Sequence, residues 1–229
     1  MSSPDRRAVV VFDLDGTLVA GDSFGAFLRH LLTRRPSHLV GALLSAPVWG
    51  PALAVGRLRL PAERWLVWLA TVGLDADRFA AAARVFAAEH AGAPGGRTAV
   101  AAVARLREHV GRGDRVVVAT ACASPLAAEV CRVIGLEDVE VVASDLRRTR
   151  WGPPAPTVPA RGEGKVQALR AAGVPLPLDH AYSDSASDLP LLRAARVPHV
   201  VDPSPRDLAR LRAALGPDVE VLRWARRRR

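Results

Sequence analysis

The sequence AVVVFDLDGTL, residues 8–18, joins a short apolar run to two acidic residues. Residues 8–12 are all apolar, as is typical of a strand that is buried on both faces of a parallel sheet. Asp13 and Asp15 follow this run, and a glycine and a threonine come next. In an open parallel sheet, ligands bind outside the carboxyl ends of the strands, so we expect both carboxylates to face a ligand.

The second half of the chain alternates short β-branched runs with amphipathic stretches. Strands are predicted at 115–120, at 139–144, in a run that ends at 180–184, and at 197–202 as the last strand. Helices are predicted at 124–135, 164–173 and 187–195. This alternation predicts the fold class α/β, with a doubly wound, parallel, Rossmann-like sheet that helices cover on both faces.

Residues 21–95 do not follow the alternation. Helical patterns are found at 23–35, 62–73 and 75–90, and the sequence GAPGG at 92–96 separates them from the rest. We therefore predict an α/β core formed by residues 1–20 and 96–229, with a helical cap inserted at 21–95.

An apolar stretch lies within this cap. No Asp, Glu, Lys or Arg occurs between Arg35 and Arg57, and Pro47, Gly50 and Pro51 are expected to interrupt the run at 39–55. As a helix, these 17 residues would extend about 25 Å, less than the roughly 30 Å of a bilayer's hydrocarbon core. Two interpretations stay open: an interfacial or re-entrant element that docks on lipid, and a buried pair of cap helices.

The formal net charge of +9 comes from 32 basic residues, of which Lys165 is the one lysine. Apart from RWARRRR at 223–229, the arginines are scattered, and no motif for nucleic acid accompanies them. A solvated positive surface is therefore predicted rather than a nucleic-acid partner. The basic tail could add peripheral contact with an anionic membrane. Two cysteines and the lack of a signal-peptide pattern predict a cytoplasmic protein, with the inner face of the cytoplasmic membrane as the site of any such contact.

Other polar residues accompany Asp13 and Asp15 at the predicted strand ends. They are Thr120 at the end of 115–120, Lys165 at the start of a helix, and Asp184 and Asp188 in YSDSASD. Converging carboxylates without a counter-charge predict a hard divalent cation, with Mg²⁺ favoured by the oxygen ligands. A hydroxyl and an ammonium suit phosphoryl oxygens. One carboxylate could act as the nucleophile, while a second moves protons.

The sequence DLDGT at 13–17, Thr120, Lys165 and SDSASD at 183–188 resemble the four motifs of the haloacid dehalogenase-like phosphatases, in the same order. The resemblance implies a phosphoric monoester hydrolase that forms an aspartyl-phosphate. It implies the following roles: Asp13 as nucleophile, Asp15 as general acid and base, Thr120 and Lys165 as phosphate ligands, and Asp188 as a supporting residue. The implied ligands of Mg²⁺ are Asp13, the main-chain carbonyl of Asp15, and Asp184.

The position of the cap resembles the phosphoserine-phosphatase-like branch of this family. That branch has an acidic residue soon after the first motif, which implies that Asp22 faces the substrate; capping of the next helix is the alternative. The arginine that binds the amino acid in that branch could correspond to Arg57, Arg59 or Arg64.

The first 75 residues are similar to the phosphatidylglycerophosphatase C family, which implies a phospholipid headgroup such as phosphatidylglycerophosphate as substrate. A small soluble phosphomonoester, similar to phosphoserine, is the first alternative. A phospho-accepting receiver-like signalling domain is the non-enzymatic one, because it also combines an acidic cluster with a Thr and a Lys. Receiver domains are shorter, however, and they have no cap.

Overall fold

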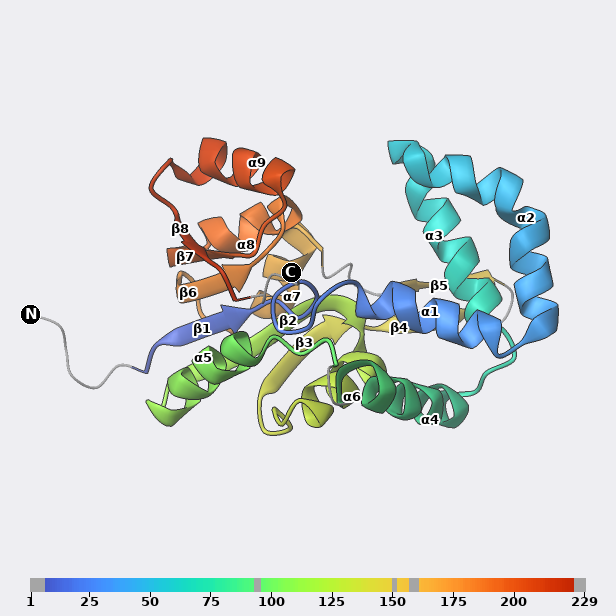
Figure 1. Ribbon diagram of the computed structural model, residues 1–229, viewed down its shortest axis with the longest axis horizontal. Coiled ribbons are helices and arrows are strands. Elements are labelled where there is room, and N and C mark those ends of the chain that lie inside the picture. Colours follow the sequence, from blue (N-terminus) through green and yellow to red (C-terminus); the bar gives the residue numbers. More distant parts are fainter. Residues whose placement is uncertain (1–6, 93–95, 150–151, 157–160, 225–229) are drawn as a thin grey trace, which may run out of the picture.

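The computed structural model describes residues 7–92, 96–149, 152–156 and 161–224, so residues 225–229 of the basic tail lie outside it (Figure 1). A six-stranded sheet of order β3-β2-β1-β6-β7-β8 forms the core, and all neighbouring strands in it are parallel. Its strands are β1 (Val9–Phe12), β2 (Arg115–Ala123), β3 (Glu140–Ser144), β6 (Leu178–Ser183), β7 (Ala195–Val201) and β8 (Glu220–Leu222).

Strand β1 lies at the centre, and the chain order runs outward from it in both directions. Phe12 pairs with Val118 of β2 and with Tyr182 of β6, so these three strands end at the same edge of the sheet. In doubly wound sheets a crevice opens where the strand order reverses, which here is the carboxyl end of β1. The residues that follow Phe12 are therefore placed at the crevice.

Helices cover both faces of the sheet because the side chains of β1 alternate between two hydrophobic clusters. Val10 and Phe12 pack with residues of α5 (Val100–Gly111) and α6 (Ser124–Val133). Val9 and Val11 pack with residues of α7 (Glu163–Ala171), α8 (Leu189–Arg193) and α9 (Pro205–Leu215). All four strand residues are buried, which explains why the run is continuously apolar. The predicted fold class is confirmed.

Three details differ from the sequence predictions. The strand at 197–202 is not the last, because β8 pairs with β7; three residues at a sheet edge give too short a pattern to recognise. A 3-10 turn (Ala186–Asp188) precedes α8, so the helix predicted at 187–195 is shorter. An antiparallel hairpin of β4 (Leu146–Thr149) and β5 (Gly152–Pro156) was not predicted, because the sequence GPPAP argues against a strand.

The helices inserted between β1 and α5 are α1 (Ser23–Thr33), α2 (Pro36–Ala54), α3 (Gly56–Thr71), α4 (Ala76–Ala87) and a π-helical turn (Ala88–Gly92). Helices α1 and α4 belong to the core cluster: the ring of Phe27 lies 5.4 Å from that of Phe79 and 5.3 Å from that of Phe86. Helices α2 and α3 pack against each other and extend away from the sheet (Figure 1).

The expectation that prolines interrupt the apolar stretch is wrong. Helix α2 is continuous through Pro47 and Pro51, although it curves along its length (Figure 1). The interpretation as a buried helix pair is wrong for α2 as well: within this helix only Ala42 is buried, and Leu44 is 79% exposed. Across the described residues, no helix has both the length and the apolar character needed to cross a membrane.

Candidate active site

The ammonium group of Lys165 lies between two carboxylates at the carboxyl edge of the sheet. Its Nζ donates to Asp13 Oδ1 at 2.8 Å and to Asp188 Oδ2 at 2.6 Å. Ser183 Oγ also donates to Asp188 Oδ2, at 2.8 Å. All four residues are buried. Lys165 therefore connects the end of β1, the first turn of α7 and the 3-10 turn after β6.

Burial and charge act in opposite directions within this group. Burial raises the pKa of Asp13, while Lys165 lowers it and Asp188 raises it further. Burial lowers the pKa of Lys165, but Asp13 and Asp188 together raise it more, so the ammonium stays charged. Two carboxylates share one cation here, which leaves the site able to take up further positive charge.

Burial raises the pKa of two more carboxyl groups at this edge. Burial raises the pKa of Asp15 to about 6, although hydrogen bonds with Ser23 lower it. The main-chain N–H of Ser23 donates to Asp15 Oδ1 at 3.0 Å. Burial also raises the pKa of Asp184 to about 6. A carboxyl group with such a pKa can both donate and accept a proton near neutral pH.

Gly16 brings Asp184 close to the loop after β1. Its φ is +83°, and a Cβ at this position would lie only 2.2 Å from Asp184 Oδ2. The carboxylate thus occupies the space that a side chain at position 16 would need, which explains the glycine of DLDGT. It also places an acid from the end of β6 beside the acids from the end of β1.

The ligands predicted for a metal ion are all oxygen atoms. Among the described residues, no three Asp, Glu, His or Cys side chains form a group that could hold a metal ion. The predicted set contains two carboxylates, from Asp13 and Asp184, and a main-chain carbonyl. Mg²⁺ binds through one or two carboxylates and keeps several waters, so an oxygen-only set with surplus negative charge fits it.

Thr120 and Asp22 lie near the same edge. Thr120 was predicted to end its strand, but β2 continues to Ala123. The Oγ1 atom of Thr120 accepts a hydrogen bond from Cys122 N–H at 3.0 Å, which leaves the hydroxyl proton free to bind a ligand. Asp22 caps α1, since its Oδ1 accepts from Gly25 N–H at 2.9 Å. The capping interpretation is confirmed, and contact of Asp22 with a substrate stays a prediction.

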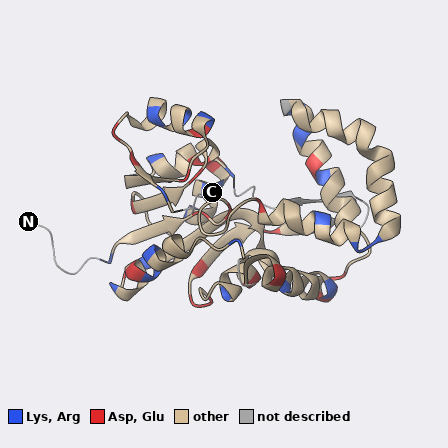
Figure 2. Ribbon diagram, viewed as in Figure 1, with Lys and Arg blue, Asp and Glu red and all other residues tan. Residues whose placement is uncertain are grey.

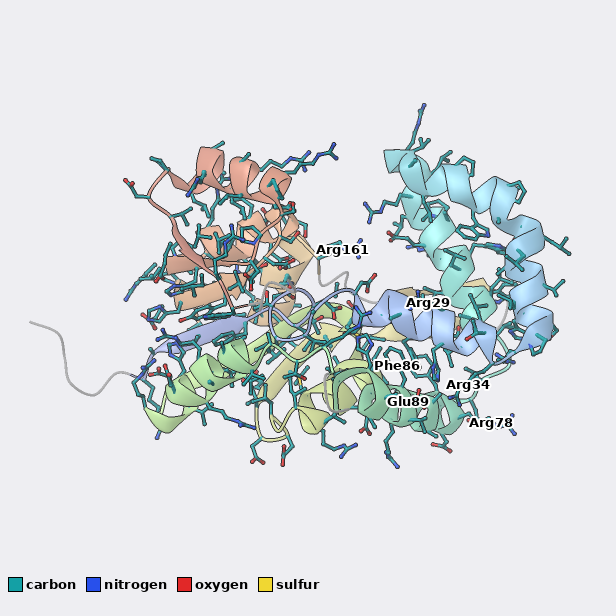
Figure 3. All side chains as sticks on the ribbon, viewed as in Figure 1. Arg29, Arg34, Arg78, Phe86, Glu89 and Arg161 are labelled. Carbon is teal, nitrogen blue, oxygen red and sulfur yellow. The ribbon has the colours of Figure 1, made fainter. Side chains whose placement is uncertain are left out.

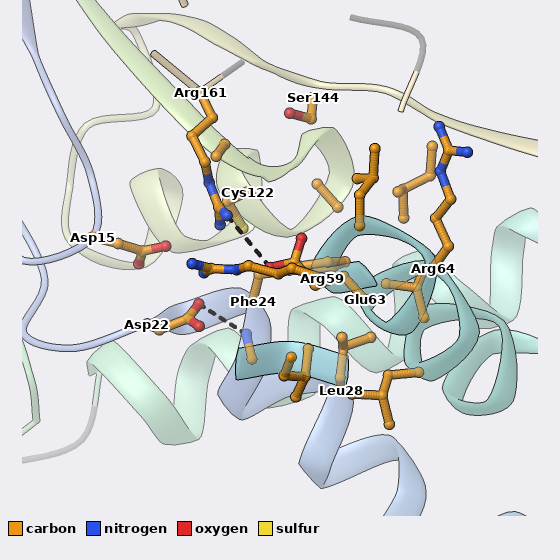
Figure 4. Close-up of a pocket in the computed structure, with 18 residues that line it drawn as sticks. Asp15, Asp22, Phe24, Leu28, Arg59, Glu63, Arg64, Cys122, Ser144 and Arg161 are labelled. Carbon is orange, nitrogen blue, oxygen red and sulfur yellow. Dashed lines mark hydrogen bonds and ion pairs between the residues drawn. The ribbon is translucent and has the colours of Figure 1, made fainter. Parts of the chain in front are cut away.

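A cavity of about 650 Å³ opens between the core and the inserted helices (Figure 4). Asp15 and Asp22 line it, which places the acids beside a space large enough for a small molecule. Most of the wall is apolar and comes from α1, α2 and α3: Phe24, Leu28, Leu53, Leu60, Leu66 and Val67. The polar part of the wall includes the carboxylate of Glu63 and three arginines: Arg59, Arg64 and Arg161.

Sequence reasoning named Arg59 and Arg64 as candidates but missed Arg161 and Ser183. Ser183 had a usable signal, because it begins the motif SDSASD. Arg161 had none beyond its place four residues before Lys165.

The sequence profile of the haloacid dehalogenase-like hydrolases matches residues 10–193, which is most of the chain. The chain belongs to this family. The match begins in β1 and ends in α8, so all four predicted motifs lie within it. Family membership confirms the predicted family and the prediction that the chain is a hydrolase.

Solved structures of similar fold agree with this assignment. A Bordetella pertussis Tohama I protein of unknown function is 25% identical, with 95% of this hydrolase and 99% of that chain covered and a TM-score of 0.73. A substrate-bound phosphoserine phosphatase is 16% identical, with 95% and 93% covered and a TM-score of 0.56. Cytosolic 5'-nucleotidase IIIB bound to cytidine is 12% identical, with 95% and 80% covered and a TM-score of 0.59. These similarities extend over the inserted helices as well as the sheet.

Proposed function

We propose that this hydrolase removes phosphate from a phosphomonoester through a covalent aspartyl-phosphate on Asp13, with Mg²⁺ as cofactor. The main support is the buried arrangement of Asp13, Lys165 and Asp188 at the carboxyl end of β1. It combines a nucleophile with a cation for phosphoryl oxygens in one water-poor site. Phosphatases among the structural neighbours are consistent with this reaction class.

In the first step, an oxygen of Asp13 attacks phosphorus, and the bond from phosphorus to the ester oxygen breaks. Because Lys165 donates a hydrogen bond to Asp13 Oδ1, we assign the attack to Asp13 Oδ2. Asp15 donates its proton to the leaving alcohol. In the second step, Asp15 takes a proton from water, the water oxygen attacks phosphorus, and inorganic phosphate leaves Asp13. A pKa of about 6 suits Asp15 to both proton transfers.

Three other residues assist these steps. The hydroxyl of Thr120 and the ammonium of Lys165 bind phosphoryl oxygens, and Asp188 holds Lys165 in place. Asp13, Asp184 and the Asp15 carbonyl would hold Mg²⁺, which supplies positive charge to offset the phosphoryl oxygens.

Phosphate release from a soluble phosphomonoester tests this proposal. We expect turnover that needs Mg²⁺ and stops with EDTA, no turnover in Asp13→Asn, and an unchanged melting temperature in that variant. The control is Thr33→Ala, which changes an exposed side chain on α1. Repeated turnover also separates the enzyme from a receiver-like domain, which accepts a phosphoryl group once. Activity of Asp13→Asn within tenfold of wild type would contradict the proposal.

We further propose a lipid phosphomonoester as the substrate, such as phosphatidylglycerophosphate, and peripheral contact with an anionic membrane. Helix α2 carries no charged side chain (Figure 2), and its Val40, Leu43, Leu44 and Val48 are all more than half exposed. A contiguous apolar face of this kind is typical of a surface that binds something outside the chain. Leu53 of the same helix lines the cavity, so one element would contact both the lipid surface and the substrate.

Vesicle binding tests the lipid proposal. The double change Leu43→Ser and Leu44→Ser should reduce co-sedimentation with anionic vesicles and lower hydrolysis of lipid phosphate, with little effect on a soluble phosphomonoester. Val100→Ser with Val110→Ser is a matched control, because both valines are exposed on α5. If wild type does not bind vesicles, and if it hydrolyses soluble esters as well as it hydrolyses lipid phosphate, a small phosphoserine-like substrate is the better assignment.

A further inference from the structure

Three of the six histidines of the chain meet on the face of the sheet where α5 packs. His109 lies on α5, His180 on β6 and His199 on β7. The ring centroid of His180 lies 5.3 Å from that of His109 and 5.2 Å from that of His199. The three rings line a cavity of about 270 Å³, and its wall and that of the cavity beside Asp15 are formed by different residues. This histidine cluster is therefore separate from the active site.

Hydrogen bonds place one proton on each ring of the pair on β6 and β7. His199 Nδ1 contacts Glu220 Oε2 on β8, and His199 Nε2 lies 2.9 Å from His180 Nδ1. Because a carboxylate only accepts, we assign the His199 proton to Nδ1, and Nε2 then accepts from His180 Nδ1–H. Both rings are neutral in this arrangement. Together with Glu220, they join β6, β7 and β8 through side-chain contacts.

His109 extends this network to α5. Its Nε2 lies 3.0 Å from the hydroxyl of Tyr182 on β6, and its Nδ1 lies 2.8 Å from Asp114 Oδ2 and 2.7 Å from Arg112 Nη2. The charged groups that face the cluster are Arg105 on α5, Arg112 and Asp114 just after it, Asp179 on β6 and Glu220 on β8. The cluster thus connects α5 to the strands through side chains of a type that changes charge near neutral pH.

Burial sets the direction in which these rings respond to pH. His109 and His199 are 2% and 8% exposed, and burial lowers the pKa of all three histidines, although Asp114 and Glu220 oppose the effect. Once the surrounding structure opens, each imidazole titrates near its ordinary pKa of about 6.5. The opened state therefore binds more protons than the folded state as the pH falls below that value. The stability that the neutral rings contribute is present above about pH 6.5 and is lost below it.

We propose that the histidine cluster is an acid-sensitive latch. While its rings are neutral, they hold α5 and β8 against β6 and β7, and when they take up protons, these contacts break and α5 and β8 open locally. His180 and His199 cannot both be charged and keep their hydrogen bond, because both facing nitrogens would then be donors. Glu220 can offset one added charge, but not three.

The latch lies behind the strand ends that form the base of the active site. The ring of Tyr182 stacks on that of Phe12 and on that of His199, with 4.2 Å between centroids in each pair. Phe12 directly precedes Asp13, and Tyr182 directly precedes Ser183. Opening of the latch therefore removes support from the base. The device belongs to the fold and does not depend on which substrate the site takes.

Amide hydrogen exchange, read by mass spectrometry at pH 7.5 and pH 5.5, tests the latch. Exchange corrected for intrinsic rates gives the protection of each element, and α6 is the internal reference because it packs against β2 and β3. In wild type, the protection of α5 and β8 should fall about tenfold more than that of α6. Each ring that gains a proton only after opening raises the opening constant by about tenfold between these pH values.

Two variants should move this difference in opposite directions. The double change His180→Gln and His199→Gln removes two titrating rings and should abolish most of the difference. Glu220→Gln should enlarge it, because it removes the carboxylate that stabilises a proton on His199 in the folded state. The Glu220 side chain is 54% exposed, so the fold should tolerate this change.

His30→Gln is the matched control. Burial lowers the pKa of His30 as well, so this variant also removes a histidine of lowered pKa. Its contacts Phe86 and Glu89 lie among the inserted helices and away from α5 (Figure 3). The difference between α6 and the two latch elements should therefore stay as in wild type.

Two results would overturn the latch. The first is a protection that changes by the same factor in α5, β8 and α6 of wild type. The second is a double histidine variant with the same difference as wild type; if that variant does not fold, a Glu220→Gln variant without a larger difference has the same meaning. The measurement needs no substrate, so failure of the latch leaves the proposed phosphatase standing, and failure of the phosphatase leaves the latch standing.

Discussion

The base of the active site and the outer face of α2 are built in opposite ways. At the base, Lys165, Asp13 and Asp188 are buried, and each charge has a partner within 2.8 Å. On α2, large apolar side chains are exposed, with Leu44 at 79%, and one residue of the helix is buried. The base is fixed by contacts inside the chain. The outer face of α2 leaves its apolar side chains exposed, and the proposed lipid contact rests on that exposure.

The largest effect is expected at the base. Lys165→Met should abolish phosphate release and lower the free energy of unfolding by about 3–5 kcal/mol, because it leaves buried carboxylates without their cation. Urea unfolding and an activity assay measure the two effects. Lys165→Arg keeps the charge and should recover part of the stability. Wild-type stability in Lys165→Met would show that the ion pairs do not hold the base together.

A pair of identical substitutions compares a buried position of the core with the outer face of α2. Leu126→Ala, in the core cluster, should lower the free energy of unfolding by about 2–5 kcal/mol through loss of apolar burial and an added cavity. Leu44→Ala on α2 should change it by less than about 0.5 kcal/mol, because the side chain is exposed. Similar losses in the two variants would mean that the Leu44 side chain is packed against the rest of the chain after all.

A smaller effect is expected in the loop after β1. Gly16→Ala should raise the Mg²⁺ concentration needed for half-maximal activity about tenfold, because its Cβ would displace the Asp184 carboxylate. Gly113→Ala is the matched control. Gly113 has φ +81°, so an alanine there has the same backbone strain as at position 16, but no heavy atom lies within 4 Å of the added Cβ. A magnesium titration that gives the same curve for both variants would argue against Asp184 as a metal ligand.

The sequence allowed the fold and the base of the site to be predicted, because both follow from short-range patterns. The apolar run at 8–12 predicts a buried strand, and parallel strands bring Asp13 and Asp184 to one edge. Other features depend on tertiary packing. Glu63 and Arg161 meet only through the angle at which α3 crosses the core, and no spacing in the sequence encodes that angle. Helix α2 continues through two prolines, against the local preference of its residues.

Asp13 is the residue that we propose to carry the phosphoryl group. Trypsin cleaves after Arg7 and Arg29, so Asp13, Asp15 and Asp22 lie in the peptide 8–29. After incubation with Mg²⁺ and a hydrolysed substrate, followed by an acid quench, fragmentation of this peptide by mass spectrometry locates any added phosphoryl group. We expect the group on Asp13 in the Asp15→Asn variant, where hydrolysis of the intermediate is slow, and no group in Asp13→Asn. Turnover in wild type together with an unmodified Asp13 in Asp15→Asn, or labelling at another residue, would contradict it.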